Sequence, residues 1–346
     1  MPSGSVTIVN TNARDLVREC LQSLNRHPYT RGSMEIVVLD NASDDGSVEM
    51  LEDEFPGVIV LTEKVRRGFG ANQNRAIAAS TGQLAFILNP DAVVGAGTIN
   101  GLAQAMWPDE RVVAAGCPTL NVDGTARQES PNPFPTPLSI YSKAFGLGKI
   151  ARKYRPVTDV FDFGWLSGGA MLIDRQIFME IGGFDESFFI YSEDVDLCRR
   201  LRASGYLFAW APDASVVHPF PTESPEMVQR RQYEIVRSEL SYMRKYYGTI
   251  GQYVYRVGAA LDSAIRVLVL RLPGISRVVS VHGTTTADIR GVQRARLRAV
   301  LRPHSGKGIA DLAATWNSNR AQAGLPSATK HPNEVPDHEN RPADPL

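Results

Sequence analysis

Short, continuous runs of apolar and β-branched residues alternate with amphipathic segments along the first 120 residues. Runs of this kind, bounded by turn residues, are typical of strands buried on both faces of a sheet. They occupy residues 5–9, 35–39, 58–61, 84–88 and 112–116. The segments with apolar residues at helical spacing between them are 15–24, 47–55 and 71–80. This alternation predicts an α/β fold with a mostly parallel sheet and helices on both of its faces.

The pattern changes after residue 120, where residues 121–162 are rich in Pro and Asn and predict a long irregular connection. A second structured unit follows, with helices expected at 175–181 and 193–203 and short apolar runs after them. We take residues 1–225 as one domain that contains both units.

The rest of the chain divides into a helical segment at 226–307 and a tail at 308–346. The segment carries apolar residues at three- and four-residue spacing, such as Val254, Val257 and Leu261. The chain end is Pro-rich and polar, so we expect the tail to be disordered.

The composition is that of a globular protein, with 43% hydrophobic and 21% charged residues among 346. The 37 basic and 37 acidic residues give a formal net charge of +0, but this neutrality is a sum of unequal parts. Residues 1–225 hold 19 basic and 27 acidic residues, a net charge of −8, whereas residues 226–307 hold 15 and 5, a net charge of +10. An acidic body is therefore joined to a basic segment.

Cys20, Cys117 and Cys198 are widely spaced and odd in number, which argues against a disulfide scaffold or a structural zinc site and favours a reducing compartment. The N-terminus lacks the basic and apolar regions of a secretory signal. The most apolar later stretch, 265–272, is too short and too charged to span a bilayer. We therefore expect a cytoplasmic protein.

Polar residues follow two of the predicted strands directly. Asp40 follows the run at 35–39, where its carboxylate either accepts a hydrogen bond from a ring N–H of a pyrimidine base or caps a turn, and alone it favours the turn. Asn89 and Asp91 flank Pro90 after the run at 84–88. Their oxygen atoms suit Mg²⁺ or Mn²⁺ bound to a diphosphate, although the tripeptide is also compatible with a simple turn.

Two further segments place chemistry at helix starts. Gly68 opens a helix after a basic run that includes Arg67, so exposed N–H groups there can meet an anion; the GxGxxG pattern is not matched. Glu193, Asp194 and Asp196 begin another helix, where acids either stabilise the helix dipole or supply a general base. A lone histidine such as His218 is more often structural than a metal ligand.

Seven motifs occur in one order, namely NTN, VVLDNASDDGS, RRGFGANQNRAIAAS, FILNPDA, WLSGGAMLI, GGFDESFFIYSEDVDLCRRL and VVHPFP. Together they resemble the family 2 glycosyltransferases of GT-A fold, a Rossmann-like sheet flanked by helices. The wording of the fourth and sixth motifs resembles that of bacterial rhamnosyltransferases that build on polyprenyl-linked glycans. The resemblance covers about residues 5–222 and implies a nucleotide-binding half at about 1–120 and an acceptor half at about 160–225.

The resemblance implies a role for individual residues. Asp194 would be the catalytic base of an inverting single displacement, with Glu193 helping to orient the acceptor or the base. Asp91 and His218 would hold Mg²⁺ or Mn²⁺ on the donor diphosphate. The remaining substrate-binding positions would be Thr11, Asp40, Arg67, Gly68, Asn74, Asn89, Trp165, Gly168 and Gly169. Asn89 departs from the family pattern, which has an Asp there, and Arg66 stands where relatives often have Asn.

The resemblance further implies a nucleotide-diphosphate sugar donor and a glycan or lipid-linked acceptor. dTDP-rhamnose is our first expectation for the donor, followed by UDP-hexoses or UDP-galactofuranose; a nucleotidyltransferase and a non-catalytic scaffold are alternatives of other classes. The basic segment is expected either to meet an anionic membrane on its cytoplasmic face or to pack on the domain or a second subunit as a homodimer. Its scattered arginines and the lack of a binding motif argue against nucleic acid.

Overall fold

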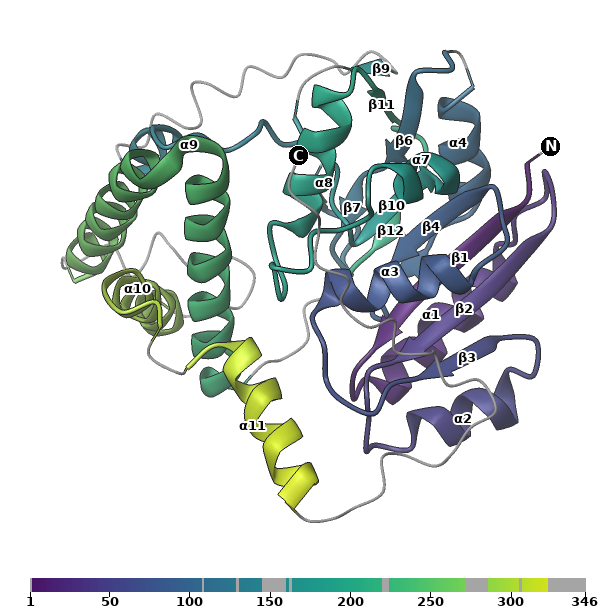
Figure 1. The fold of residues 1–346 in the computed structure, drawn as a ribbon, viewed down its shortest axis with the longest axis horizontal. Helices are drawn as coiled ribbons and strands as arrows, with labels where there is room; N and C mark the ends of the chain where they lie inside the picture. The colour runs from purple at the N-terminus through teal and green to yellow at the C-terminus, as the bar shows by residue number, and fades with distance from the viewer. Residues whose placement is uncertain are drawn as a thin grey trace, which may run out of the picture.

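The computed structural model describes residues 2–107, 109–128, 131–144, 160–161, 164–219, 224–271, 286–304 and 307–322. Strands and short helices from residues up to 219 form an α/β body, and the long helices after residue 224 lie beside it (Figure 1). The predicted fold class, an α/β domain with a helical C-terminal extension, is confirmed.

The main sheet has eight strands in the order β3-β2-β1-β4-β10-β6-β11-β9. They are β1 (Gly4–Asn10), β2 (Met34–Asp40), β3 (Ile59–Thr62), β4 (Leu84–Leu88), β6 (Val112–Gly116), β9 (Val160–Phe161), β10 (Ala170–Asp174) and β11 (Leu207–Trp210). β3, β2, β1 and β4 run parallel to one another, and β11 runs parallel to β6. The five strands predicted in the first 120 residues are all present.

β10 runs antiparallel to both β4 and β6, within a sheet that is mostly parallel as predicted. A parallel strand would need a crossover back to the amino edge of the sheet. The chain instead leaves β6 into short strands at the carboxyl edge and enters β10 from that edge, where Ala170 pairs with Leu88. The residues just before β10 therefore lie where β1, β2 and β4 end.

A second, smaller sheet has the order β5-β12-β7-β8, formed by β5 (Val93–Val94), β12 (Val216–Val217), β7 (Thr119–Leu120) and β8 (Ala126–Gln128). Val216 pairs with Val94, which brings the residue after β12 close to the segment between β4 and β5. Strands of two or three residues show no measurable periodicity, and only the run at β12 was anticipated.

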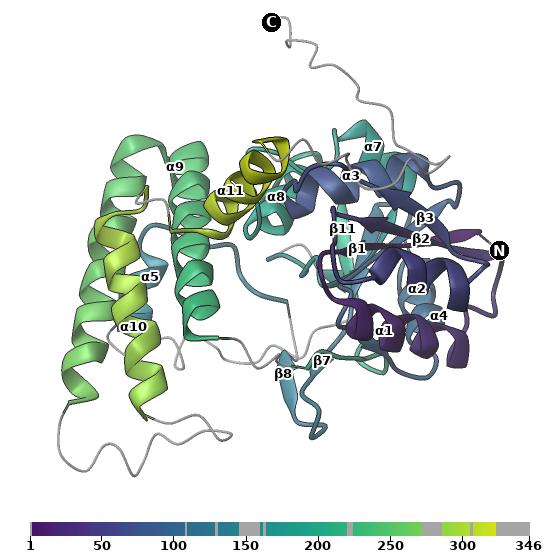
Figure 2. The same cartoon turned by 90° about the horizontal axis from the view of Figure 1, so that it is seen from below.

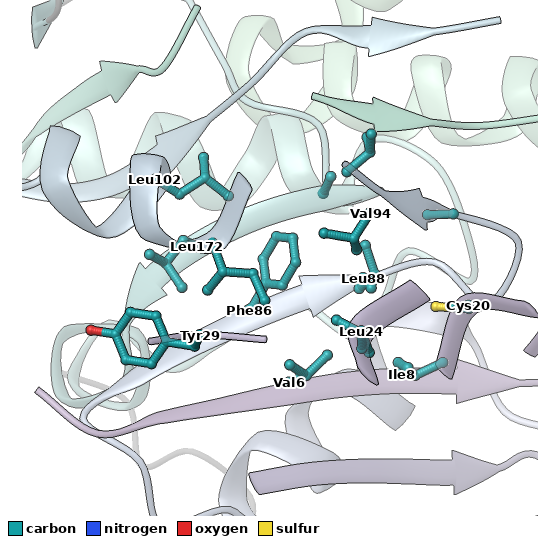
Figure 3. Close-up of a cluster of buried hydrophobic side chains, with 14 of the residues drawn as sticks. Val6, Ile8, Cys20, Leu24, Tyr29, Phe86, Leu88, Val94, Leu102 and Leu172 are labelled. Atoms are coloured by element: carbon teal, nitrogen blue, oxygen red, sulfur yellow. The ribbon is translucent and has the colours of Figure 1, made fainter. Parts of the chain in front are cut away.

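Helices cover both faces of the main sheet, as predicted. One face packs on α1 (Arg14–Arg26), α2 (Ser47–Glu54) and α4 (Thr98–Ala105), and the other packs on α3 (Phe69–Ala79), α7 (Arg175–Glu180) and α8 (Glu193–Ala203). Phe86 and Leu88 of β4 belong to the first core, together with Leu24 and Leu102 (Figure 3). α4 was not predicted, because Gly97 just before it and Gly101 within it weaken the helical pattern of this segment.

The C-terminal helices are α9 (Pro225–Val269), α10 (Thr286–Leu301) and α11 (Ile309–Gln322), and α5 (Ser139–Ala144) packs against α9. α9 turns sharply at Gly248, whose φ of 66° only glycine adopts readily (Figure 1). The expectation of disorder from residue 308 is wrong for α11. Polar contacts, such as those of Asp311 with Arg237 and of Asn317 with Arg66, hold this helix, so its sequence shows little hydrophobic periodicity. Residues 323–346 lie outside the described residues, as does 145–159 of the predicted connection.

None of the helices in the described part of the chain combines the length and the apolar run that a bilayer crossing requires. Cys20, Cys117 and Cys198 are buried thiols, as expected of a chain without a disulfide scaffold.

Candidate active site

Backbone strain marks the carboxyl edge of the sheet. Within the described ranges, the non-glycine residues with positive φ are Asn12, Ala42, Tyr191 and Ser192. Asn12 follows β1, Ala42 follows β2, and the other two precede α8. A positive φ costs an L-residue free energy and persists where the surrounding structure demands it, most often at functional sites.

Asp40, at the end of β2, ties the two N-terminal loops together. Its Oδ1 accepts from Asn10 Nδ2 at 2.9 Å and its Oδ2 accepts from the Ser43 N–H at 2.8 Å. Burial raises the pKa of Asp40, against hydrogen bonds from Ser43 and Asn10 that lower it. Only 1% of the surface of Asp40 is exposed, so its main role in this structure is to hold the loops after β1 and β2 in position at the edge of the site.

Asn41 connects Thr11 to the loop between β3 and α3. Its Nδ2 donates to Thr11 Oγ1 and to the Arg67 carbonyl, both at 3.1 Å, and its Oδ1 accepts from the Arg67 N–H at 2.8 Å. The Arg67 guanidinium pairs with Glu63 at 3.4 Å, and Arg75 pairs with the same carboxylate. The charge expected from this basic run is therefore partly neutralised by buried Glu63.

Gly68 and Asn74 are placed beside the segment that leads into α8. A Cβ on Gly68 would lie 2.4 Å from the Phe189 carbonyl oxygen, so this glycine is needed for close packing. The Asn74 amide accepts from the Phe184 N–H at 2.8 Å and donates to the Phe184 carbonyl at 2.9 Å. Both residues therefore fix the position of the segment that leads into α8, and the substrate contacts expected of them remain predictions.

Asn89, Asp91 and His218 come together as predicted. His218 Nε2 lies 3.1 Å from Asp91 Oδ1 and 3.0 Å from Asn89 Nδ2. His218 Nδ1 lies 3.3 Å from the Pro219 carbonyl oxygen, the arrangement in which a metal-binding histidine donates its other ring proton to a backbone carbonyl. In that tautomer Nε2 carries the ring's free lone pair, which can accept from Asn89 Nδ2 at 3.0 Å and lies beside Asp91 Oδ1.

This geometry fits a divalent cation. Two neighbouring ligands of an octahedral ion, each at about 2.1 Å, lie about 3.0 Å apart. The Asp91 Oδ1 and His218 Nε2 atoms have this separation. In the residues the structure describes, no group of three or more His, Cys, Asp and Glu side chains forms a complete metal cage, so other ligands would have to come from substrate oxygens or water.

Gly168 and Gly169 join this group to the start of α8. The Asn89 N–H donates to the Gly169 carbonyl at 3.0 Å, and the Gly168 N–H donates to Asp194 Oδ2 at 3.0 Å. Because consecutive Cα atoms lie about 3.8 Å apart, the Asp194 carboxylate and Asn89 border one small region. Trp165, just before these glycines, is half-buried and packs between the α/β core and the C-terminal helices.

The three acids at the start of α8 have different environments. Asp196 is fully buried and ion-paired with Arg200 at 2.8 Å and Lys245 at 2.5 Å, which anchors α9. Burial, and then the charge of Asp194, hold the pKa of Glu193 well above its ordinary value. Burial also raises the pKa of Asp194, against hydrogen bonds from the Gly168 and Val195 N–H groups. Asp194 is thus the carboxylate that faces Gly168, next to Glu193, whose pKa is also raised.

Asn10, Asn41 and Ser43, which organise the loops after β1 and β2, were not among the predicted site residues. They stand in the NTN and DNAS motifs beside residues that were predicted, so the motifs could have identified them. Asn317 of α11, which binds the backbone of Arg66, belongs to no such motif.

The chain matches the family model described as Glycosyl transferase family 2 over residues 5–182 and a second, Glycosyl transferase family group 2, over residues 149–287. It is 31% identical over 217 residues to the N-acetylglucosaminyl-diphospho-decaprenol L-rhamnosyltransferase of Mycobacterium tuberculosis, covering 55% of this chain and 67% of that protein. It is 25% identical over 224 residues to the rhamnosyltransferase WbbL of Escherichia coli, covering 62% and 82%.

Among solved structures, the mannosyltransferase PcManGT from Pyrobaculum calidifontis, determined in complex with GDP-Man and Mn²⁺, has a TM-score of 0.56 at 16% identity. The match covers 89% of this chain and 88% of that one. At this identity the likeness establishes the fold, which is the GT-A fold.

Proposed function

Because the chain belongs to glycosyl transferase family 2, and is therefore a glycosyltransferase, we propose that it moves L-rhamnose from dTDP-rhamnose to a hydroxyl of a polyprenyl-diphosphate-linked glycan, with inversion. The observation that carries the proposal is the link from Asn89 through Gly169 and Gly168 to Asp194. It sets a carboxylate beside the residues suited to a diphosphate. UDP-hexoses and UDP-galactofuranose are the second choice of donor.

In this mechanism Asp194 accepts the proton of the acceptor hydroxyl as its oxygen attacks the anomeric carbon. The bond from that carbon to the donor diphosphate breaks on the opposite side, so the configuration inverts. A raised pKa makes the Asp194 carboxylate a better proton acceptor. The two hydrogen bonds from backbone N–H groups hold the carboxylate in place.

Asp91 and His218 would hold Mg²⁺ or Mn²⁺, with Asn89 beside them. A bound divalent cation would neutralise charge on the diphosphate leaving group. Thr11 and the rim formed by Asp40 and Arg67 would receive the nucleoside. Trp165 would border the acceptor.

Donor identity is tested by thermal-shift measurements with dTDP-L-rhamnose, UDP-galactofuranose and UDP-glucose, each with and without Mn²⁺. We expect the largest Mn²⁺-dependent rise in Tm with dTDP-L-rhamnose, followed by deoxyhexose transfer to N-acetylglucosaminyl-diphospho-polyprenol detected by mass spectrometry. A shift with a UDP-sugar alone would replace the donor, and a product of retained anomeric configuration would overturn the single displacement.

We also propose that the second half of α9 meets the anionic membrane that carries the acceptor. Ile250, Val257, Leu261 and Leu268 recur on one helical stripe and are exposed. The surrounding segment is basic. Ile250→Asp should reduce co-sedimentation with anionic vesicles, whereas Val122→Asp, at an equally exposed apolar position of the α/β body, should not. Loss of a dimer in Ile250→Asp with unchanged vesicle binding would instead favour a second subunit.

A further inference from the structure

α11 reaches from the C-terminal helices to the loop between β3 and α3 (Figure 2). Asn317 Oδ1 accepts from the Arg66 N–H at 2.8 Å, and Asn317 Nδ2 donates to the Arg66 carbonyl at 3.1 Å. Both bonds join residues 251 positions apart. The end of the described chain is therefore attached to the nucleotide side of the site.

Asn317 binds the backbone of Arg66 in the same way that Asn41 binds the backbone of the next residue, Arg67. Asn41 binds the N–H and carbonyl of Arg67 in the same two-bond manner. The two consecutive residues are thus clamped by amide side chains, one from the loop after β2 and one from α11. A loop held on both sides is pre-organised, which reduces the ordering cost when a ligand binds.

The Arg66 side chain is held but not fully satisfied. Its guanidinium lies 4.2 Å from the centre of the Trp316 ring, and its Nη2 lies 3.7 Å from Asp44 Oδ1. Only 14% of the side chain is exposed, and within the described part of the chain its Nε and Nη2 are buried without a hydrogen-bond partner. A buried cation with unused N–H donors is costly unless another group supplies the acceptors.

The residues around Arg66 indicate what kind of ligand would supply these acceptors. Asp44 belongs to the loop that follows β2, whose last residue is Asp40. The Arg320 guanidinium also lies on the Trp316 ring, 5.0 Å from its centre. Two guanidinium groups gathered beside the nucleoside rim favour an oxygen-rich, anionic ligand.

We propose that α11 is part of the donor site, with Trp316 and Asn317 as positioning residues that hold Arg66 so that its free N–H groups donate to oxygens of the bound nucleotide. This rests on the proposed function, since it takes the site to bind a nucleotide-diphosphate sugar. α11 lies beyond both family-model matches, which end at residues 182 and 287. Docking of α11 and donor binding would then strengthen each other by the same factor.

The test is calorimetric binding of dTDP and UDP, each with Mn²⁺, to the full chain and to Trp316→Ala, Asn317→Ala and Trp316→Phe. The alanine variants should weaken binding about tenfold, the scale of one charge-assisted hydrogen bond, and Trp316→Phe should recover much of it. Donor KM should rise while kcat and acceptor KM stay unchanged. The matched control is Trp107→Ala, which removes another tryptophan under an arginine, Arg31 at 5.6 Å.

A double-mutant cycle separates positioning from general destabilisation. In an Arg66→Ala background, Trp316→Ala should have little further effect on nucleotide affinity, because it acts through Arg66. Additive effects, or alanine variants that bind as tightly as Trp107→Ala, would overturn the role of α11 and leave the proposed function intact. A wild-type chain that binds neither nucleotide would overturn both.

Discussion

The Nε2 atom of His218 lies 3.1 Å from Oδ1 of Asp91, although the two residues are 127 positions apart in the sequence. The small sheet produces this contact, because β12 pairs with β5 directly after the turn that contains Asp91. The pair offers one oxygen and one nitrogen atom at the separation that two ligands of a single cation would have.

Removing either ligand should weaken metal-dependent donor binding. We expect Asp91→Ala and His218→Ala each to raise the Mn²⁺ concentration needed for half-maximal activity by about tenfold or more. Titration of activity with Mn²⁺ after EDTA treatment measures this, and Asp109→Ala, an exposed carboxylate paired with Arg111, is the control. Full activity of Asp91→Ala in EDTA would rule out the metal role.

The two acids at the start of α8 should respond differently to loss of charge. Asp194→Asn removes the proton acceptor, and we expect kcat to fall by about 10²–10⁴-fold with little change in nucleotide affinity. Glu193→Gln mimics the protonated form that burial favours, so it should retain most activity. Because the pKa of Asp194 is raised, the acid limb of the kcat profile should lie at a higher pH than the ordinary Asp pKa of about 3.9. Equal losses in both variants would contradict the assignment.

Glu193 should also make stability depend on pH. Its pKa is higher in the folded protein than in the unfolded chain, so between the two values the folded state binds more protons. The free energy of unfolding therefore falls as pH rises through this range. The Tm of Glu193→Gln relative to that of wild type should therefore rise as the pH increases above the ordinary Glu pKa of about 4.3. Exposed Glu49→Gln should show no such trend, and a pH-independent difference for Glu193→Gln would refute the raised pKa.

Gly169 should tolerate a methyl group poorly. A Cβ there would lie 3.3 Å from Asn89 Nδ2, closer than ordinary contact, so Gly169→Ala should shift Asn89 and lower kcat several-fold, on the order of 1 kcal/mol. Gly101→Ala is the matched control: it lies within α4 and meets only the Ala214 side chain at 3.5 Å, so it should leave activity unchanged and add about 0.5–1 kcal/mol of stability. Wild-type kinetics for Gly169→Ala would show that Asn89 need not hold its position.

The sequence predicted most of the fold because the buried strands are contiguous apolar runs whose local pattern determines their structure. Asp40 and Asp91 end or follow parallel strands and lie at the same edge of the sheet, whereas Asp194 and His218 were assigned to the site by the family resemblance. The direction of β10 depends on the path of a long connection, and no local pattern encodes that path.

Some contacts of the candidate residues depend on distant parts of the chain. Gly68 packs against Phe189 and Asn74 binds Phe184, and the substrate contacts expected of both remain predictions. The run of acids alone does not separate Asp196 from Asp194, because the Lys245 that pairs with Asp196 is distant in the sequence. Asn317 acts on a residue 251 positions away.

The reversed β10 gives the site a fixed internal length. Asn89 leaves β4 and Gly169 enters β10 at the same level, joined by a main-chain hydrogen bond that no side chain supplies. In the mechanism proposed above, two hydrogen-bonded strands running in opposite directions would then set the distance from the leaving group to the proton acceptor. On that proposal, residues before Gly168 or around Thr11 could diverge to take a new sugar or acceptor without altering this spacing.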